Sequence, residues 1–244
     1  MAHGFGGSAR NFRAQARALS DAWRVVTFDL RGHARSEAPR DPGAYTLTAL
    51  ADDVGRVLEA QGAAHAVVGG LSLGAAAALA FAAGHPERVR GLVLASFPAS
   101  RSATRGGGFA RIAAAFADAI EHDGLEAAGA RFVWGPDSGL DARGAAFVRQ
   151  GFLEHPPHAL ALTLRGVLAV LPEPGEMARA LAARDVPVLL VAGGEDAGSL
   201  ESHAALARAL PRARRVVVPD AGHVVNLAAP AAFDAALREF LASL

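Results

Sequence analysis

The amino-acid sequence predicts an α/β fold in which a mostly parallel sheet is flanked by helices, with a helical insertion between two of its strands. Three observations support this prediction. Five short apolar runs show no polar alternation, amphipathic helices separate several of them, and residues 100–175 contain helical patches only. Strands that are apolar on both sides are typical of a sheet that helices cover on both faces.

The expected strands are short, rich in Val and Leu, and spread along the chain. They are VVTFDL (25–30), AVVGG (66–70), GLVLAS (91–96), VPVLLVAG (186–193) and RVVVP (215–219). The clearest helix is 46–61, where apolar residues recur every third or fourth position and Thr46 is the expected N-cap. Further helices are expected over 199–210 and 230–244. Alternating strands and helices favour a parallel sheet.

The alternation stops between about Ser100 and Gly175, where helical patches are separated by Gly and Pro. We therefore expect a discontinuous core formed by residues 1–99 and 176–244, with residues 100–175 as an inserted helical domain. RSATRGGG (101–108) is the only low-complexity segment, and its composition predicts a flexible hinge or loop.

Composition excludes several classes of function. The 244 residues include 24 basic and 24 acidic side chains, so no basic excess indicates a nucleic acid or an anionic membrane as partner. The chain has no cysteine, which rules out disulfides, thiolate metal sites and a cysteine nucleophile. No signal peptide and no apolar run long enough to span a bilayer is visible. We expect a cytoplasmic protein.

A possible nucleophile lies in GLSLG, residues 70–74, which follows an expected strand and precedes an Ala-rich helix. A strand, a sharp turn and a helix are the setting that a G-x-S-x-G nucleophile elbow requires. The turn exposes the serine hydroxyl, and small residues two before and two after it keep neighbouring backbone from colliding. Ser72 is therefore the candidate nucleophile.

A serine needs a base to take its proton, and the base is commonly a histidine oriented by a carboxylate. Asp196 follows the end of one expected strand and His223 follows the end of the next. Catalytic groups gather at the carboxyl ends of parallel strands, so these two residues are the candidate acid and base. Glu195 and Asp220 remain alternatives for the acid.

The opening segment HGFGG, residues 3–7, has the composition of a tight loop whose N–H groups point outward. Attack on a carbonyl creates an oxyanion, which is stabilised by two fixed donors. One donor is the N–H of the residue after the nucleophile, Leu73, and the other comes from a loop after an earlier strand. We expect Phe5 to supply the second donor.

Three other histidines are weaker candidates. EHPPH contains His155 and His158, but the two prolines between them break any helical face and no carboxylate cluster is near in sequence. We expect a solvated turn there rather than a metal site. His33 in DLRGHARS follows a strand end, and a turn residue is the favoured interpretation.

Six segments resemble successive signature segments of the α/β-hydrolase superfamily: HGFGGS, FDLRGHARS, GGLSLG, HPERVRGLVLAS, GGED and DAGHVVNLAAP. The resemblance implies Ser72 as nucleophile, Asp196 as acid, His223 as base, and the Phe5 and Leu73 N–H groups as the oxyanion hole. It also implies that no cofactor is needed, and that the insertion is the cap domain of that fold.

Within the superfamily the chain most resembles small capped enzymes related to 3-oxoadipate enol-lactonase and carboxylesterases. This resemblance implies a small-molecule ester or lactone as substrate, and we expect Gly4 and Val224 to contact it. The segment LALTLRGVLAVL is similar to the menaquinone-pathway synthase, which eliminates pyruvate, but alanine follows the elbow where that synthase has arginine. A non-catalytic hydrolase-like binding protein is a further alternative. Ala34 stands where the family usually has glycine.

The N-terminus poses a structural problem. In the family, a strand between those expected here at 25–30 and 66–70 leads into the oxyanion loop, and two more strands precede it. Only Met1 and Ala2 precede HGFGG. We therefore expect a gap in the sheet or direct pairing of 25–30 with 66–70, either of which would leave the loop without an anchor. The corresponding hypothesis is an N-terminal extension of about 15–30 residues, enough for the missing short strands.

Overall fold

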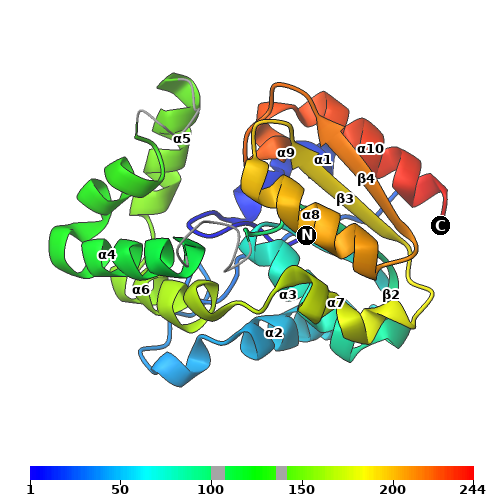
Figure 1. Ribbon diagram of the computed structural model, residues 1–244, viewed down its shortest axis with the longest axis horizontal. Helices are drawn as coiled ribbons and strands as arrows, with labels where there is room; N and C mark the ends of the chain where they lie inside the picture. The colour runs from blue at the N-terminus through cyan, green and yellow to red at the C-terminus, as the bar shows by residue number, and fades with distance from the viewer. Residues whose placement is uncertain (100–107, 136–141) are drawn as a thin grey trace.

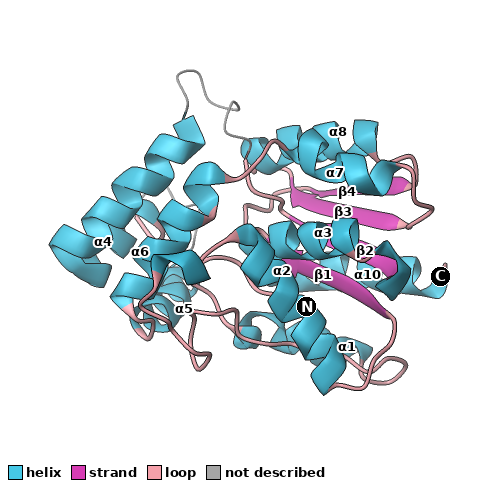
Figure 2. Ribbon diagram, turned by 90° about the horizontal axis from the view of Figure 1, so that it is seen from below, coloured by secondary structure: helices cyan, strands magenta, loops and turns pink. Residues whose placement is uncertain are grey.

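The computed structural model describes residues 1–99, 108–135 and 142–244. Within these residues a parallel sheet has four strands in the order β1-β2-β3-β4 (Figure 2). The strands are β1 (Ala66–Leu71), β2 (Val89–Ala95), β3 (Val188–Gly193) and β4 (Ala213–Val218). Four of the five strands expected from the sequence are thus confirmed, with ends that differ by at most two residues.

Helices cover both faces of the sheet because successive strand residues point to opposite sides. Leu92 and Leu94 of β2 pack on one face, while Val93 and Ala95 pack on the other. The first face is covered by α2 (Leu47–Ala60), α3 (Leu73–Gly84), α7 (Pro174–Ala182) and α8 (Ala197–Ala209). The second is covered by α1 (Arg13–Leu19), α9 (Val225–Ala228) and α10 (Pro230–Ala242), and Figure 1 shows α8 in front of the strands and α10 behind them.

Between β2 and β3 the chain forms α4 (Gly108–Phe132), α5 (Ala142–Leu153), α6 (Pro157–Gly166) and the 3₁₀ turn η5 (Leu168–Val170). We call these four elements the helical insertion. They lie to one side of the sheet (Figure 1), and the expectation of helices here is confirmed. Gly124 has φ +80° and marks a kink inside α4. The hinge expected over 101–108 lies outside the described residues, apart from Gly108.

The remaining short elements are 3₁₀ turns at the chain's connections: η1 (Ala9–Phe12), η2 (Pro42–Ala44) and η3 (Pro86–Arg88). The predicted N-cap of α2 is confirmed, because the Thr46 hydroxyl accepts a hydrogen bond from the Ala49 N–H at 3.1 Å. No helix in the described part of the chain has the length and apolar character needed to cross a membrane.

The predicted strand over 25–30 is wrong in extent, because only Phe28 within it forms a bridge. Its partner is Ala2, which also bridges Gly70 of β1. Ala2 donates to the Gly69 carbonyl and accepts from the Leu71 N–H, both at 2.9 Å. A ladder needs residues on both sides, and a segment of one or two residues cannot extend it.

The expected loss of the loop's anchor is also wrong. Ala2 is buried and occupies the position between Phe28 and β1, so 25–30 and β1 neither pair directly nor leave a gap at that level. The Met1 amino group donates to the Val26 carbonyl at 2.7 Å and extends the same contact by one residue. HGFGG therefore starts from a fixed point beside β1.

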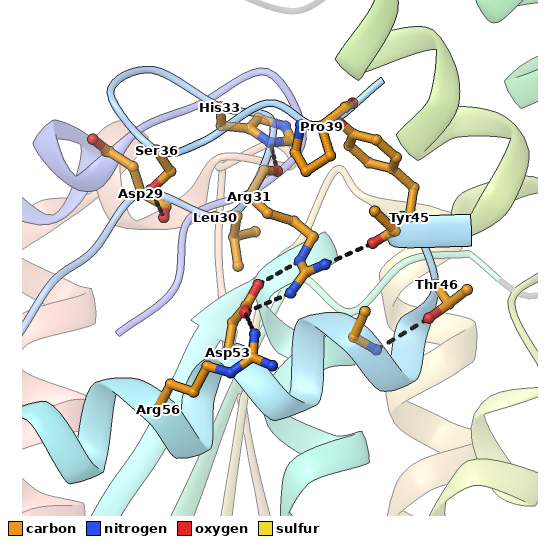
Figure 3. Close-up of polar contacts among 12 residues, drawn as sticks. Asp29, Leu30, Arg31, His33, Ser36, Pro39, Tyr45, Thr46, Asp53 and Arg56 are labelled. Atoms are coloured by element: carbon orange, nitrogen blue, oxygen red, sulfur yellow. Dashed lines mark hydrogen bonds and ion pairs between the residues drawn. The ribbon is translucent and has the colours of Figure 1, made fainter. Parts of the chain in front are cut away.

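A bidentate ion pair joins the segment after Phe28 to α2 (Figure 3). Nε and Nη2 of Arg31 donate to the two carboxylate oxygens of Asp53, each at 2.6 Å. Nη1 of Arg31 donates to the Ala44 carbonyl at 2.9 Å. Both charged side chains are mostly buried, so the pair is stronger than an exposed one and fixes the turn that follows Asp29.

Candidate active site

Ser72 lies at the sharp turn between β1 and α3, as the motif predicts. Its backbone has φ +53° and ψ −114°, a strained conformation for a residue with a side chain. The two flanking glycines are required by close approach. A Cβ on Gly70 would lie 2.4 Å from the Gly74 carbonyl carbon, and a Cβ on Gly74 would lie 2.2 Å from the Ala2 carbonyl oxygen. The elbow geometry is thus confirmed, and it depends on the N-terminal residues.

The two expected oxyanion donors lie in the right local settings. Leu73 is the first residue of α3, and its N–H has no hydrogen-bond partner among the described residues. The same holds for the Phe5 N–H within that part of the chain. Gly4 lies against the elbow, because a Cβ built on it would be 3.4 Å from the Ser72 Cβ. Two unpaired N–H groups therefore belong to residues next to Ser72 and Gly4.

A type II turn over residues 4–7 sets the orientation of the Phe5 N–H. The Gly7 N–H donates to the Gly4 carbonyl at 3.0 Å, and Gly6 has φ +66°. His3 Nδ1 donates to the same carbonyl at 2.8 Å, while Nε2 accepts from the Leu30 N–H at 2.9 Å. The peptide is trans, so the Phe5 N–H points away from the side on which the Gly4 carbonyl is held.

His3 performs this task as a neutral ring. It is completely buried, and burial lowers its pKa to about 4 although the Gly4 carbonyl and Asp29 act in the opposite direction. A ring with one donor and one acceptor matches its two partners. Sequence reasoning named the loop but missed this role, and the only available signal was that a histidine immediately precedes the glycines.

Asp196 and His223 are brought together. His223 Nδ1 lies 2.7 Å from Asp196 Oδ2, while Asp196 Oδ1 accepts from the Ser199 N–H at 3.2 Å and caps α8. Burial alone would raise the pKa of Asp196, but the hydrogen bonds from His223 and Ser199 outweigh it and lower that pKa. Among the described contacts His223 bonds neither Glu195 nor Asp220, so the structure favours Asp196 over the two alternatives.

The surroundings of this pair hold it in place. The buried Ser199 hydroxyl donates to the Phe97 carbonyl at 2.9 Å and lies 3.5 Å from His223 Nδ1. Beyond His223, the Asn226 amide donates to the Asn11 carbonyl at 2.8 Å and so ties the histidine loop to η1. Neither Ser199 nor Asn226 is recognisable from the sequence, because their partners lie far away along the chain.

Ser72 and His223 approach from the same edge of the sheet. The Ser72 N–H bonds the Ala95 carbonyl at the end of β2, and the Ser96 N–H bonds Val191 of β3. The carboxyl ends of the parallel strands are therefore level. No hydrogen bond joins the Ser72 hydroxyl to His223 within the described part of the chain, and the His223 side chain is 46% exposed. Val224, beside it, packs partly buried against the second core face.

The expectation of a solvated turn is wrong for His155, which is 3% exposed. Its Nε2 lies 2.8 Å from the Gly7 carbonyl and its Nδ1 lies 3.1 Å from the Phe152 carbonyl. His158 is half-buried and contacts the Ala38 carbonyl at 3.2 Å. His33 does lie in a turn, but it is fully buried, and burial lowers its pKa well below the ordinary value.

An aromatic wall faces the turn that carries Phe5. The Phe5 ring contacts Phe116 and Phe152 of the helical insertion edge-on, with centroids 5.5 and 6.3 Å apart. Phe116 stacks on Phe132, and Trp134 packs edge-on against Phe152. Helices of the insertion thus supply apolar surface directly beside the candidate oxyanion hole.

A separate polar hollow of about 480 Å³ contains none of the candidate catalytic residues in its lining, which consists of Ser8, Ala9, Arg10, Asp29, Ala34, Arg35 and Glu154. The described residues also include no group of three acidic, histidine or cysteine side chains that could hold a metal ion. The groups available for chemistry at the elbow are the serine, the histidine–aspartate pair and the two N–H groups.

Comparison with known proteins agrees with this fold. A family profile described as alpha/beta hydrolase fold matches residues 1–116, and another described as TAP-like protein matches residues 169–244. A protein of Bacillus subtilis (strain 168), provisionally named 2-succinyl-6-hydroxy-2,4-cyclohexadiene-1-carboxylate synthase, is 32% identical over 99% of this chain and 89% of its own length.

Solved structures are similar over nearly the whole chain. A thermophilic esterase from Thermogutta terrifontis has a TM-score of 0.84 at 30% identity, covering 99% of this chain and 88% of the esterase. The enol-lactonase from Burkholderia xenovorans LB400 has a TM-score of 0.86 at 25% identity, covering 99% and 89%. From its fold, its elbow and these relatives, the chain belongs to the α/β-hydrolase superfamily.

Proposed function

We propose that this protein is a serine hydrolase that cleaves a small carboxylic ester or lactone through an acyl-enzyme. The observation that carries the proposal is the strained Ser72 elbow flanked by two unpaired N–H groups, at the sheet edge where His223 meets Asp196. A serine on such a turn, a histidine fixed by a carboxylate and a pair of free backbone donors are what acyl transfer requires.

In the proposed mechanism the Ser72 hydroxyl attacks the substrate carbonyl and His223 Nε2 takes the proton. Nε2 is the available nitrogen because Nδ1 is bonded to Asp196. Asp196 holds the ring orientation and stabilises the imidazolium, and the Phe5 and Leu73 N–H groups bind the oxyanion. The imidazolium then protonates the leaving alkoxide, and water hydrolyses the acyl-enzyme. The missing Ser72–His223 bond does not oppose this, since catalytic hydrogen bonds often close only with substrate.

The apolar surroundings of the turn favour a substrate with an apolar group. The rings of Phe5, Phe116, Phe152 and Trp134 pack beside the turn, although Phe116 and Phe152 are themselves buried. In this proposal the helical insertion acts as the cap of residues 100–175, Gly4 and Val224 contact the substrate, and no cofactor takes part. The reaction needs only a small molecule and water, with no nucleic acid or membrane.

The decisive test compares Ser72→Ala with Ser20→Ala, a control at an exposed serine on the protein surface. Wild type should hydrolyse short p-nitrophenyl esters and react with a fluorophosphonate at Ser72. Ser72→Ala should lose on the order of 10⁴-fold or more in kcat/KM and all labelling, while Ser20→Ala keeps both. Retained turnover in purified Ser72→Ala protein would eliminate the mechanism, and a folded wild type that is never labelled would favour a non-catalytic binding protein.

A synthase-like elimination of pyruvate is the second candidate, favoured by the name of the Bacillus subtilis relative. The residue after the elbow glycine is Ala75, which is fully buried, where the menaquinone-pathway synthase has an arginine. A buried methyl group cannot hold a substrate carboxylate. Both candidates use Ser72, so labelling does not separate them. Pyruvate release from the synthase's substrate, without hydrolysis of any ester in a panel, would select the lyase.

A further inference from the structure

His155 joins the helical insertion to the turn that carries Phe5. It follows α5 and is buried, and its Nε2 donates to the Gly7 carbonyl at 2.8 Å across 148 positions of sequence. We propose that His155 is a positioning residue, which holds the Phe5 N–H in place for the oxyanion by fixing the far end of its turn. The proposal rests on the proposed function, because it assigns a role within the same site.

The turn is held at both ends by imidazoles. Its first carbonyl, that of Gly4, accepts from His3 and from the Gly7 N–H. Its last carbonyl, that of Gly7, accepts from His155. The Phe5 N–H belongs to the peptide whose carbonyl is held by His3 and by the Gly7 N–H, so releasing Gly7 at its own carbonyl loosens one of the two restraints on that peptide. His3 belongs to the core, whereas His155 belongs to the insertion.

Packing makes the contact specific. Phe152 lies directly on Gly6, where a Cβ would be only 2.5 Å from the Phe152 ring. The His155 ring meets His33 edge-on at 5.2 Å, and His33 lies 5.1 Å from His3. Three buried imidazoles therefore form a row beneath the turn. His155 is buried and contacts the backbone of the turn, so we assign it a role in holding the oxyanion donor rather than in contacting the substrate.

The bonding pattern of His155 indicates which contact matters. Both ring nitrogens face carbonyl oxygens, at 2.8 Å for Gly7 and 3.1 Å for Phe152. The shorter of the two contacts is the one that reaches the turn. Glu154 precedes His155 in the sequence but pairs with Arg10, and no hydrogen bond joins either side chain to the His155 ring among the described residues.

The test compares His155→Ala and His155→Gln with His158→Ala as a control. His158 lies three residues further on, in the first turn of α6, and its contact is with the Ala38 carbonyl and not with the turn of residues 4–7. We expect His155→Ala to lower kcat for p-nitrophenyl esters by about 10- to 100-fold, part of the loss of a whole donor, with KM within about threefold. His155→Gln, which keeps one N–H donor, should recover most of kcat, and His158→Ala should match wild type.

Deuterium uptake of the peptide covering residues 3–8 gives a readout that does not depend on catalysis. Uptake should rise in His155→Ala and stay at the wild-type level in His158→Ala. If His155→Ala does not fold, His155→Phe replaces it, since phenylalanine keeps a ring without a donor. An unchanged kcat together with unchanged uptake would overturn the positioning role, as would a loss expressed entirely in KM. Absence of esterase activity in wild type would refute the proposed function, while the uptake comparison would still decide the positioning role.

Discussion

Replacement of Gly74 by alanine should disrupt the elbow through the N-terminal residues rather than through the helix. The new Cβ would lie 2.2 Å from the Ala2 carbonyl oxygen and 2.6 Å from the His3 carbonyl oxygen. Ordinary contact begins at 3.4 Å, so the backbone of residues 2–3 has to retreat by about 1 Å. Because the three nearest atoms are all backbone atoms, the clash cannot be relieved by turning a flexible side chain.

The cost of Gly74→Ala follows from what that retreat breaks. Ala2 makes two ladder bonds of 2.9 Å with Gly69 and Leu71, each worth about 1 kcal/mol net. Overpacking a tight site adds about 1–3 kcal/mol. We therefore expect the free energy of unfolding to fall by about 3–5 kcal/mol, a large part of the stability of an ordinary domain. The same shift displaces the Phe5 turn and should lower the rate of the proposed ester hydrolysis by about 10²-fold.

Gly84→Ala is the matched control, since it lies at the other end of α3 with open space around its Cβ. Alanine is the better helix former by up to about 1 kcal/mol, so this variant should be neutral or slightly more stable. Urea unfolding followed by tryptophan fluorescence, with equal m-values as a condition, measures both. A Gly74→Ala protein within about 0.5 kcal/mol of Gly84→Ala would refute the argument, because the clash would then have been absorbed without loss.

Three further outcomes are expected. Burial lowers the pKa of His3 to about 4 from an ordinary 6.5, so the neutral ring stabilises the folded state. Its contribution to the free energy of unfolding is complete above about pH 6.5 and is lost as the pH falls toward 4, by at most about 3 kcal/mol. Urea unfolding of His3→Asn should show a shallower dependence over that range, and parallel curves would contradict this. Arg31→Lys should lower the free energy of unfolding by about 1–2 kcal/mol, because an ammonium cannot replace the bidentate contact with Asp53. Arg56 is the exposed partner of Asp53, so Arg56→Lys should change that free energy little. Ala34 has φ +47°, so Ala34→Gly should raise the free energy of unfolding by up to about 1 kcal/mol. A lower urea midpoint for this variant would contradict the prediction.

Local patterns were sufficient to predict most of the sheet and the elbow. Runs of Val and Leu indicate β1 to β4. The Ser72 turn is recognisable because the small residues that it requires, Gly70 and Gly74, lie within the same five-residue motif. The segment 25–30 has the same composition as a strand but forms only one bridge, because pairing depends on a partner that the segment itself does not reveal. The catalytic roles assigned to Ser72, Asp196 and His223 remain proposals.

Residues whose meaning depends on distant partners could not be interpreted from the sequence. His155 precedes two prolines, a local pattern that indicates a solvated turn. Its partner Gly7 lies 148 positions away, near the N-terminus. Asn226 and Ser199 are similar cases, since each bonds a carbonyl more than 100 positions away. Periodicity and motif spacing carry no information about such contacts.

The close packing of Phe152 against Gly6 limits how the substrate range can be engineered. Exchanging the helical insertion for that of a relative is an attractive way to graft a new pocket onto this core. Here the graft would also change the packing against the turn of residues 4–7, because the insertion supplies Phe152, whose ring covers Gly6. A chimera should therefore transfer the turn together with the insertion, or keep an aromatic residue at position 152. If the proposed function holds, a chimera without that pairing should turn over every substrate more slowly, whatever its new pocket accepts.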